Sequence, residues 1–190
     1  MKNQDNIFVF PTRHDPGGKV RIAIPKHITS TAKFSSCDRY RYSLMRMWNE
    51  NLPGVMFLMM NPSTADLQKN DPTVAKCMRL AVRWGYGRLY VGNVCAYRAT
   101  DKRNLLFVDD PVGAENHASL LAMAGHVGRI VVAHGKLPTG LQQHAVRACV
   151  ALQEAGHSLH VLKLSETDGT PWHPLYIKED QVPFPWGGPS

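Results

Sequence analysis

The sequence predicts an α/β fold, a three-layer sandwich in which helices cover both faces of a mainly parallel central sheet. Between residues 55 and 164, short apolar runs alternate with segments of helical periodicity in the order β-α-β-α-β-α-β. The apolar runs contain few polar residues, which is typical of parallel strands buried on both faces. Right-handed crossovers between successive runs then place the strands in one sheet.

The predicted strands are apolar segments that glycine, proline or charged residues separate from the next helix. They are VMFLMM at 55–60, LYVGNVCAY at 89–97, RIVVAH at 129–134 and LHVLKL at 159–164. Gly92 and Asn93 interrupt the second run.

The predicted helices have helically spaced apolar residues and recognisable end signals. These signals are Asp71-Pro72 and Gly85 for the first helix, Asp110-Pro111 for the start of the second, and Gly156 for the end of the third. An aspartate followed by proline is a common helix start, because the carboxylate caps free N–H groups and proline fits the first helical position.

The two ends of the chain have weaker patterns. We expect residues 1–32 to be an N-terminal extension or an edge hairpin, and residues 20–24 are a candidate strand. Residues 33–178 are expected to form a single α/β domain, in which 40–48 is an edge strand or a short helix. Proline and glycine predict an irregular C-terminal tail at 179–190.

Composition limits the classes of partner and compartment. A formal charge of +7 and a pI of about 9.4 favour nucleic acid or a nucleotide as partner. We expect a cytoplasmic protein without a membrane partner, since there is neither a bilayer-spanning run nor a signal-peptide block. The cysteine spacing indicates buried thiols rather than a metal site, and we expect no cofactor. The oligomeric state stays open.

Polar residues follow the predicted strands, where parallel α/β sheets bind ligands. Most of them lie at a strand end, within some residues beyond it or at the next helix start, and Asn93 interrupts the second predicted strand. They are Asn61, Pro62, Ser63, Thr64, Asp71, Asn93, Arg98, Thr100, Asp101, His134, Lys136, Trp172, His173 and Pro174. Each also has a structural explanation, as a turn residue, a helix cap, a surface ion pair or a buried histidine. Only their convergence on one edge of the sheet favours a site.

Two basic groups are candidates for contacts with a nucleic-acid backbone. Lys76, Arg79 and Arg83 share one face of the first predicted helix. Arg39 and Arg41 alternate with tyrosines in DRYRYSLMRMW, a mixture suited to stacked bases and phosphates. A basic row of this kind is usually a solvated helix face, and ordinary aromatic packing explains the second pattern equally well.

Several blocks resemble an uncharacterised bacterial and phage family, known as domain of unknown function 1643. The blocks are CDRYRYSLMRMW, MMNPSTAD, DPTVAKCMRLAVRWGYG, NVCAYRATD and GTPWHPLY, between about residues 33 and 177. No established activity accompanies this resemblance.

More distantly, Asn61-Pro62 and His173-Pro174 are similar to two motifs of the uracil-DNA glycosylase superfamily. That likeness implies its helix-flanked parallel sheet, with Asn61 positioning water and His173 contacting the base. The chain also departs from the pattern of the domain of unknown function 1643 family at two places. The third strand ends in His134-Gly135, where that family tends to have Trp-Gly, and Thr167 and Trp172 occupy the positions of its usual Lys and Arg before the histidine motif.

Three functions are therefore compatible with the sequence. The first is a glycosylase-like hydrolase that acts on a base in nucleic acid or in a nucleotide, where the base of a nucleic acid is extruded into the pocket. The second is a non-catalytic module that binds a nucleotide or modified base, because no charged general base is evident beside Asn61. The third is an enzyme acting on a free nucleotide or nucleoside.

Overall fold

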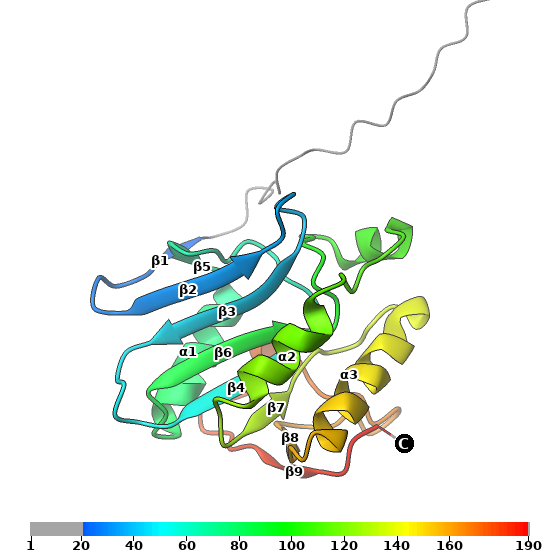
Figure 1. The fold of residues 1–190 in the computed structure, drawn as a ribbon. Coiled ribbons are helices and arrows are strands. Elements are labelled where there is room, and N and C mark those ends of the chain that lie inside the picture. The colour runs from blue at the N-terminus through cyan, green and yellow to red at the C-terminus, as the bar shows by residue number, and fades with distance from the viewer. Residues whose placement is uncertain (1–20, 190) are drawn as a thin grey trace, which may run out of the picture.

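The computed structural model describes residues 21–189 and contains a seven-stranded mixed sheet (Figure 1). The strand order is β2-β3-β6-β4-β7-β8-β9. Its strands are β2 (Thr29–Phe34), β3 (Arg41–Met47), β4 (Gly54–Met59), β6 (Arg88–Asn93), β7 (Ile130–Val132), β8 (Leu159–Val161) and β9 (Phe184–Trp186). A small second sheet pairs β1 (Ile22–Ala23) with β5 (Lys69–Asn70).

The expectation of a mainly parallel sheet is correct only for the centre. The strands β6, β4, β7 and β8 are parallel to their neighbours in this group. The β2–β3, β3–β6 and β8–β9 pairs are antiparallel. The sheet is mixed because segments from both ends of the chain extend the parallel core.

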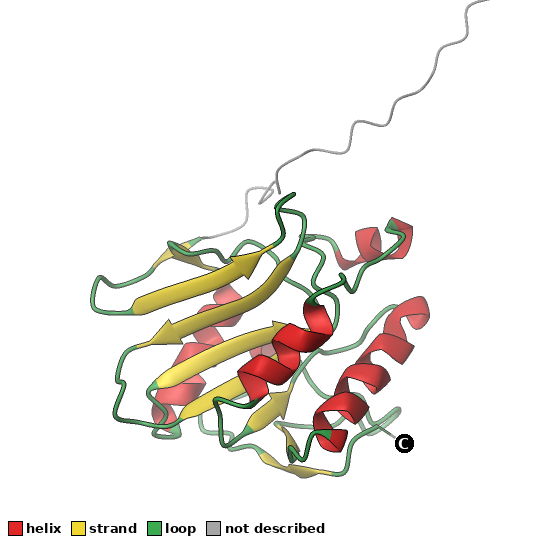
Figure 2. Ribbon diagram, viewed as in Figure 1, coloured by secondary structure: helices red, strands yellow, loops and turns green. Residues whose placement is uncertain are grey.

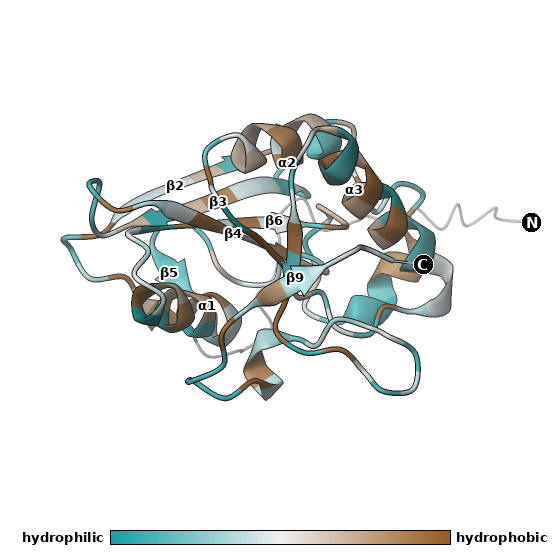
Figure 3. Cartoon of the chain, turned by 90° about the horizontal axis from the view of Figure 1, so that it is seen from below, coloured by the Kyte–Doolittle hydropathy of each residue, from teal (hydrophilic) through white to brown (hydrophobic). Residues whose placement is uncertain are grey.

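Helices cover both faces of the sheet, as Figure 3 shows. One face carries α1 (Pro72–Arg83), which connects β4 to β6. The other carries α2 (Asn116–Ala124) and α3 (Gln142–Glu154). The connections after β4 and β7 therefore leave the sheet on opposite faces, although these strands are neighbours. Such a divergence leaves a crevice at the carboxyl ends of the two strands.

Alternate residues of β4 supply the two halves of the core. All six residues of this strand are buried. Met56 and Leu58 pack on the side of α2 and α3, whereas Phe57 packs toward α1. At Gly92 in β6, a Cβ would lie 2.5 Å from Leu120 Cδ2, so glycine permits the close approach of α2.

The secondary structure in Figure 2 corrects four sequence predictions. Residues 41–47 form a strand inside the sheet, not at its edge. The second apolar run leaves the strand after Asn93. The second helix begins at Asn116, because the Asp110 carboxylate accepts from Val112 N and Gly113 N in a turn. The tail is not wholly irregular, since β9 covers the outer edge of β8, where proline is tolerated.

The structure also bears on the expected N-terminal segment and on the cysteines. Residues 29–34 form β2, so the sheet extends across the expected boundary between 32 and 33. Residues 1–20, most of the predicted extension, lie outside the described part of the chain. Cys37 is exposed, contrary to the prediction of buried thiols, and Cys77, Cys95 and Cys149 are buried.

Within residues 21–189, every helix is too short or too polar to traverse a lipid bilayer.

Candidate functional site

A cavity of about 920 Å³ lies at the carboxyl ends of the central strands, where the connections diverge. Its volume is within the range usual for small-molecule sites, about 300–1,000 Å³. Ten of the predicted residues line it: Arg41, Asn61, Ser63, Asp71, Asn93, Thr100, His134, Lys136, Trp172 and His173. The structure therefore brings together residues that are up to 132 positions apart in the sequence, from 41 to 173.

The orientation of the Asn61 amide is determined by two carbonyl groups. Its Nδ2 donates to Pro62 O at 2.9 Å and to Ala99 O at 2.8 Å. Carbonyl oxygens only accept, so the amide cannot be reversed without losing both bonds. Its Oδ1 accepts from no described residue and is available as an acceptor at the cavity.

His134 presents an acceptor to the cavity. Its Nδ1 lies 2.7 Å from Gly135 O, and because a carbonyl only accepts, Nδ1 carries the proton. Burial lowers the pKa of His134, which keeps the ring neutral at pH 7. The neutral ring with a protonated Nδ1 has a lone pair on Nε2.

His173 has the opposite tautomer. Its Nδ1 accepts a long hydrogen bond of 3.4 Å from Leu175 N at the start of a short 3-10 turn, Pro174–Tyr176. Burial lowers the pKa of His173, so the neutral ring carries its proton on Nε2 and is a donor. Gly135, at φ +67°, packs closely against His173. A Cβ at this position would lie 3.0 Å from His173 Cβ, and any residue other than glycine would be strained at this φ.

Asp71 has two functions in the structure. Its Oδ1 caps α1 by accepting from Val74 N at 2.8 Å, as the sequence predicted. Asp71 is also buried and lines the cavity. The structure thus places a carboxylate in the same cavity as Asn61 and His173, whereas the sequence showed no evident charged base beside Asn61.

Arg41 is not a surface contact for a nucleic-acid backbone, because only 2% of the residue is exposed. It lies on the cavity wall and donates to Ala65 O at 2.9 Å and to Asn93 Oδ1 at 3.2 Å. Its Nε has no partner among the described residues. Burial lowers the pKa of Arg41 to about 10, which leaves it a cation at neutral pH.

Several predicted site residues do not line the cavity and instead hold its loops in place. Pro62 and Thr64 are buried in the loop after β4, and Pro174 begins the turn after His173. Arg98 forms an ion pair with Asp38 at 2.7 Å rather than with Asp101. Asp101 caps the 3-10 helix Lys102–Phe107 and pairs with Arg103.

The predicted basic row on α1 is largely engaged within the protein. Lys76 is buried and contacts Glu179 at 2.8 Å, and Arg79 reaches the same carboxylate at 3.0 Å. Arg83 is exposed on this helix. Arg39 is also exposed, beside the Cys37 thiol, whose pKa is lowered to about 7 by hydrogen bonds with Ser35 and Arg39.

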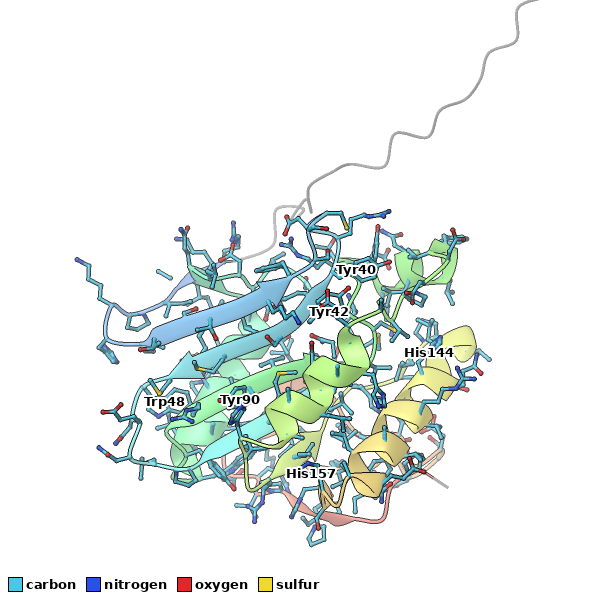
Figure 4. The ribbon with its side chains drawn as sticks, viewed as in Figure 1. Tyr40, Tyr42, Trp48, Tyr90, His144 and His157 are labelled. Atoms are coloured by element: carbon cyan, nitrogen blue, oxygen red, sulfur yellow. The ribbon has the colours of Figure 1, made fainter. Side chains whose placement is uncertain are left out.

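The aromatic residues of the basic segment are spread along β3 rather than gathered into a stacking platform (Figure 4). Tyr40 stacks on Tyr42 near one end of the strand, with ring centroids 6.0 Å apart. Trp48 lies beyond the other end and donates from Nε1 to Tyr86 O at 3.0 Å. Packing therefore explains this pattern.

The cavity also contains residues that the sequence did not single out. Among them are Thr73, Lys102, Asp168, Thr170 and Tyr176. Lys102 and Tyr176 each lie within three residues of a predicted site residue, so a wider window around the motifs would have found them. The Lys136 ammonium lies 3.4 Å from Asp168 Oδ2. Lys163 covers the ring of Trp172, at 4.0 Å from its centroid.

Within the described part of the chain, no three His, Cys, Asp or Glu side chains are placed to hold a metal ion.

Comparison with known proteins gives one match. No curated protein and no solved structure matches the chain. A family model described as "Protein of unknown function (DUF1643)" matches residues 41–175. This span includes Arg41 near its beginning and His173 near its end, and it covers more than two thirds of the chain. The protein therefore belongs to the DUF1643 family.

Proposed function

We propose that the cavity is the active site of a glycosylase-like hydrolase, which cleaves the bond between a nucleobase and its sugar. The observation that carries this proposal is the fixed Asn61 amide. Its oxygen is oriented by two hydrogen bonds from Nδ2 and lines the same cavity as His173 and Asp71. The distant likeness of Asn61-Pro62 and His173-Pro174 to the uracil-DNA glycosylase motifs agrees with this assignment.

The proposed reaction is the attack of a water molecule on the sugar carbon C1′. Asn61 Oδ1 accepts one hydrogen bond from the water and orients it. The water oxygen forms the new bond to C1′, and the electrons of the broken C1′–N bond leave with the base. Asp71 takes the proton that the water loses. The departing base, which gains negative charge, receives a hydrogen bond from His173 Nε2.

The test is release of free base by the purified protein. The substrates are a panel of oligonucleotides with deaminated or modified bases, together with the corresponding nucleosides and nucleotides. Free base is measured by mass spectrometry. We expect Asn61→Ala to lower turnover by about 10²–10³-fold, the usual effect of removing one oriented polar group from an active site.

A matched variant controls for the loss of an asparagine elsewhere. Asn51→Ala removes an exposed side chain before β4, far along the strand from its carboxyl end, and should leave turnover unchanged. If no base on the panel is released above the Asn61→Ala background, the hydrolase proposal is wrong. Ligand binding without turnover would then indicate a non-catalytic nucleotide or base module.

A second candidate is an enzyme for a free nucleotide or nucleoside. The specific observation in its favour is the occupation of the α1 cations by Glu179, which reduces the surface available to track a phosphate backbone. Competition between an oligonucleotide and a mononucleotide for the cavity distinguishes the two. The small-molecule candidate predicts that the mononucleotide binds at least as tightly.

A further inference from the structure

We propose that Arg41 binds a phosphate monoester inside the cavity, so that the ligand carries a terminal phosphate. This inference rests on the proposed function only for the nucleoside part of the ligand. The phosphate part follows from the charge, burial and contacts of Arg41.

Arg41 is a buried cation. Burial lowers the pKa of its guanidinium to about 10, and the neighbouring Asp71 charge acts in the opposite direction. At neutral pH the group is therefore a cation, although only 2% of the residue is exposed to solvent. A buried charge is costly unless an opposite charge and hydrogen bonds compensate for it.

The charge and the hydrogen-bond donors of Arg41 are incompletely compensated within the described part of the chain. The two acceptors of Arg41 are neutral oxygens, Ala65 O and Asn93 Oδ1. Its Nε has no acceptor, and it forms no ion pair with a described carboxylate. An anion that entered the cavity next to Arg41 would supply both the missing charge and the missing acceptor.

Two other side chains of the cavity are suited to the same anion. The Ser63 hydroxyl is buried and has no hydrogen-bond partner among the described residues. Lys102 donates to Lys136 O at 3.1 Å and forms no ion pair within the described chain. Lys136, in contrast, already has Asp168 as its partner.

Negative groups in the cavity restrict where the anion can lie. Asp71 and Asp168 both line it. Asp168 is paired with Lys136, whereas Asp71 carries its charge at the cap of α1. Because Asp71 repels an anion, a phosphate gains binding energy only when it lies closer to Arg41 than to Asp71. Arg41, rather than the net charge of the cavity, therefore determines the binding.

The burial of Arg41 also restricts the type of phosphate. The backbone of a duplex that passes over the surface would not reach a side chain with 2% exposure. A terminal phosphate can enter the cavity, either on a free mononucleotide or at the end of a strand. Both are phosphate monoesters, and the experiment distinguishes them.

The experiment measures dissociation constants by calorimetry for the full chain. The ligands are inorganic phosphate, nucleosides, their 5′-monophosphates, and a dinucleotide with and without a 5′-phosphate. We expect each monophosphate to bind about tenfold or more tightly than its nucleoside, as a charge-assisted hydrogen bond implies. Inorganic phosphate should compete with the monophosphate. A gain confined to the dinucleotide would identify a strand end as the source.

Variants assign the effect to Arg41. Arg41→Gln should abolish the advantage of the monophosphate, whereas Arg79→Gln makes the same charge change on α1 outside the cavity and should retain it. Asp71→Asn keeps a good helix cap and should tighten monophosphate binding by removing a repulsive charge. Circular dichroism and thermal unfolding verify that each variant is folded.

Two results would overturn the inference. One is that the 5′-phosphate gives no gain in affinity in the unaltered protein, either to the nucleoside or to the dinucleotide, including no binding of any of them, which decides the matter even if Arg41→Gln does not fold. The other is an advantage that survives in folded Arg41→Gln. Base release is measured separately. If the unaltered protein binds phosphate through Arg41 but releases no base, only the proposed hydrolase is contradicted.

Discussion

The two ends of β3 carry buried arginines with different surroundings. Arg46 is completely buried and donates from all three nitrogens, to Asn70 Oδ1, Ser30 Oγ and the carbonyls of three residues. Arg41, at the cavity end, has two acceptors and an unpartnered Nε. Burial lowers the pKa of each to about 10. Similar burial with unequal hydrogen bonding is the reason why we assign Arg46 to the stability of the fold and propose a ligand for Arg41.

The largest expected effect follows from removing the satisfied arginine. Arg46→Met leaves five buried or partly buried acceptors without this donor and should lower the free energy of unfolding by about 3–5 kcal/mol. Arg41→Met abandons two acceptors and removes an incompletely compensated charge, so we expect a loss of about 1–2 kcal/mol. Urea unfolding measures both. Equal losses would remove the distinction between the two ends of β3.

The next effect is a pH dependence at the cavity end. Burial lowers the pKa of His134 below its ordinary value of 6.5, so the unfolded state binds more protons than the folded state just below that pH. The contribution of the neutral His134 ring to the free energy of unfolding should therefore be fully present above about pH 6.5. It should fall as the pH decreases below that value, by at most about 1.4 kcal/mol per pH unit for one histidine.

Replacement of this histidine isolates its contribution. His134→Asn should make the decrease in unfolding free energy between pH 7 and pH 5 less steep. His144, His160 and His173 also have pKa values lowered by burial, so the slope should not vanish. An unchanged slope in His134→Asn would contradict a neutral, buried imidazole at this position.

The smallest expected effect concerns α1, where a carboxylate compensates the cations. Glu179→Gln removes the partner of Lys76 and Arg79, and should cost about 1 kcal/mol or less because the carboxylate is partly exposed. It should also raise non-specific affinity for DNA, which filter binding at low salt can measure. If DNA affinity does not change, the α1 face plays no part in binding a phosphate backbone.

Much of the fold is predictable because its signals are local. The apolar run at 55–60 is buried within β4 apart from its last residue, and Asp71 caps α1 as its sequence context indicates. In contrast, β9 could not be recognised from VPFPWGG, since its pairing with β8 compensates for prolines that disfavour a strand. Asp110-Pro111 carries the same helix signal as Asp71-Pro72 but forms a turn.

The candidate site divides in the same way. By itself, the sequence determined the α/β alternation and the positions of Asn61 and His134 just beyond strand ends, because chain direction and periodicity place them there. Only the tertiary structure decided which charges are free. Glu179 neutralises Lys76 across 103 positions, and Arg41 lies on the cavity wall rather than on the surface. Burial and pairing depend on which distant segments meet, and no local pattern encodes that.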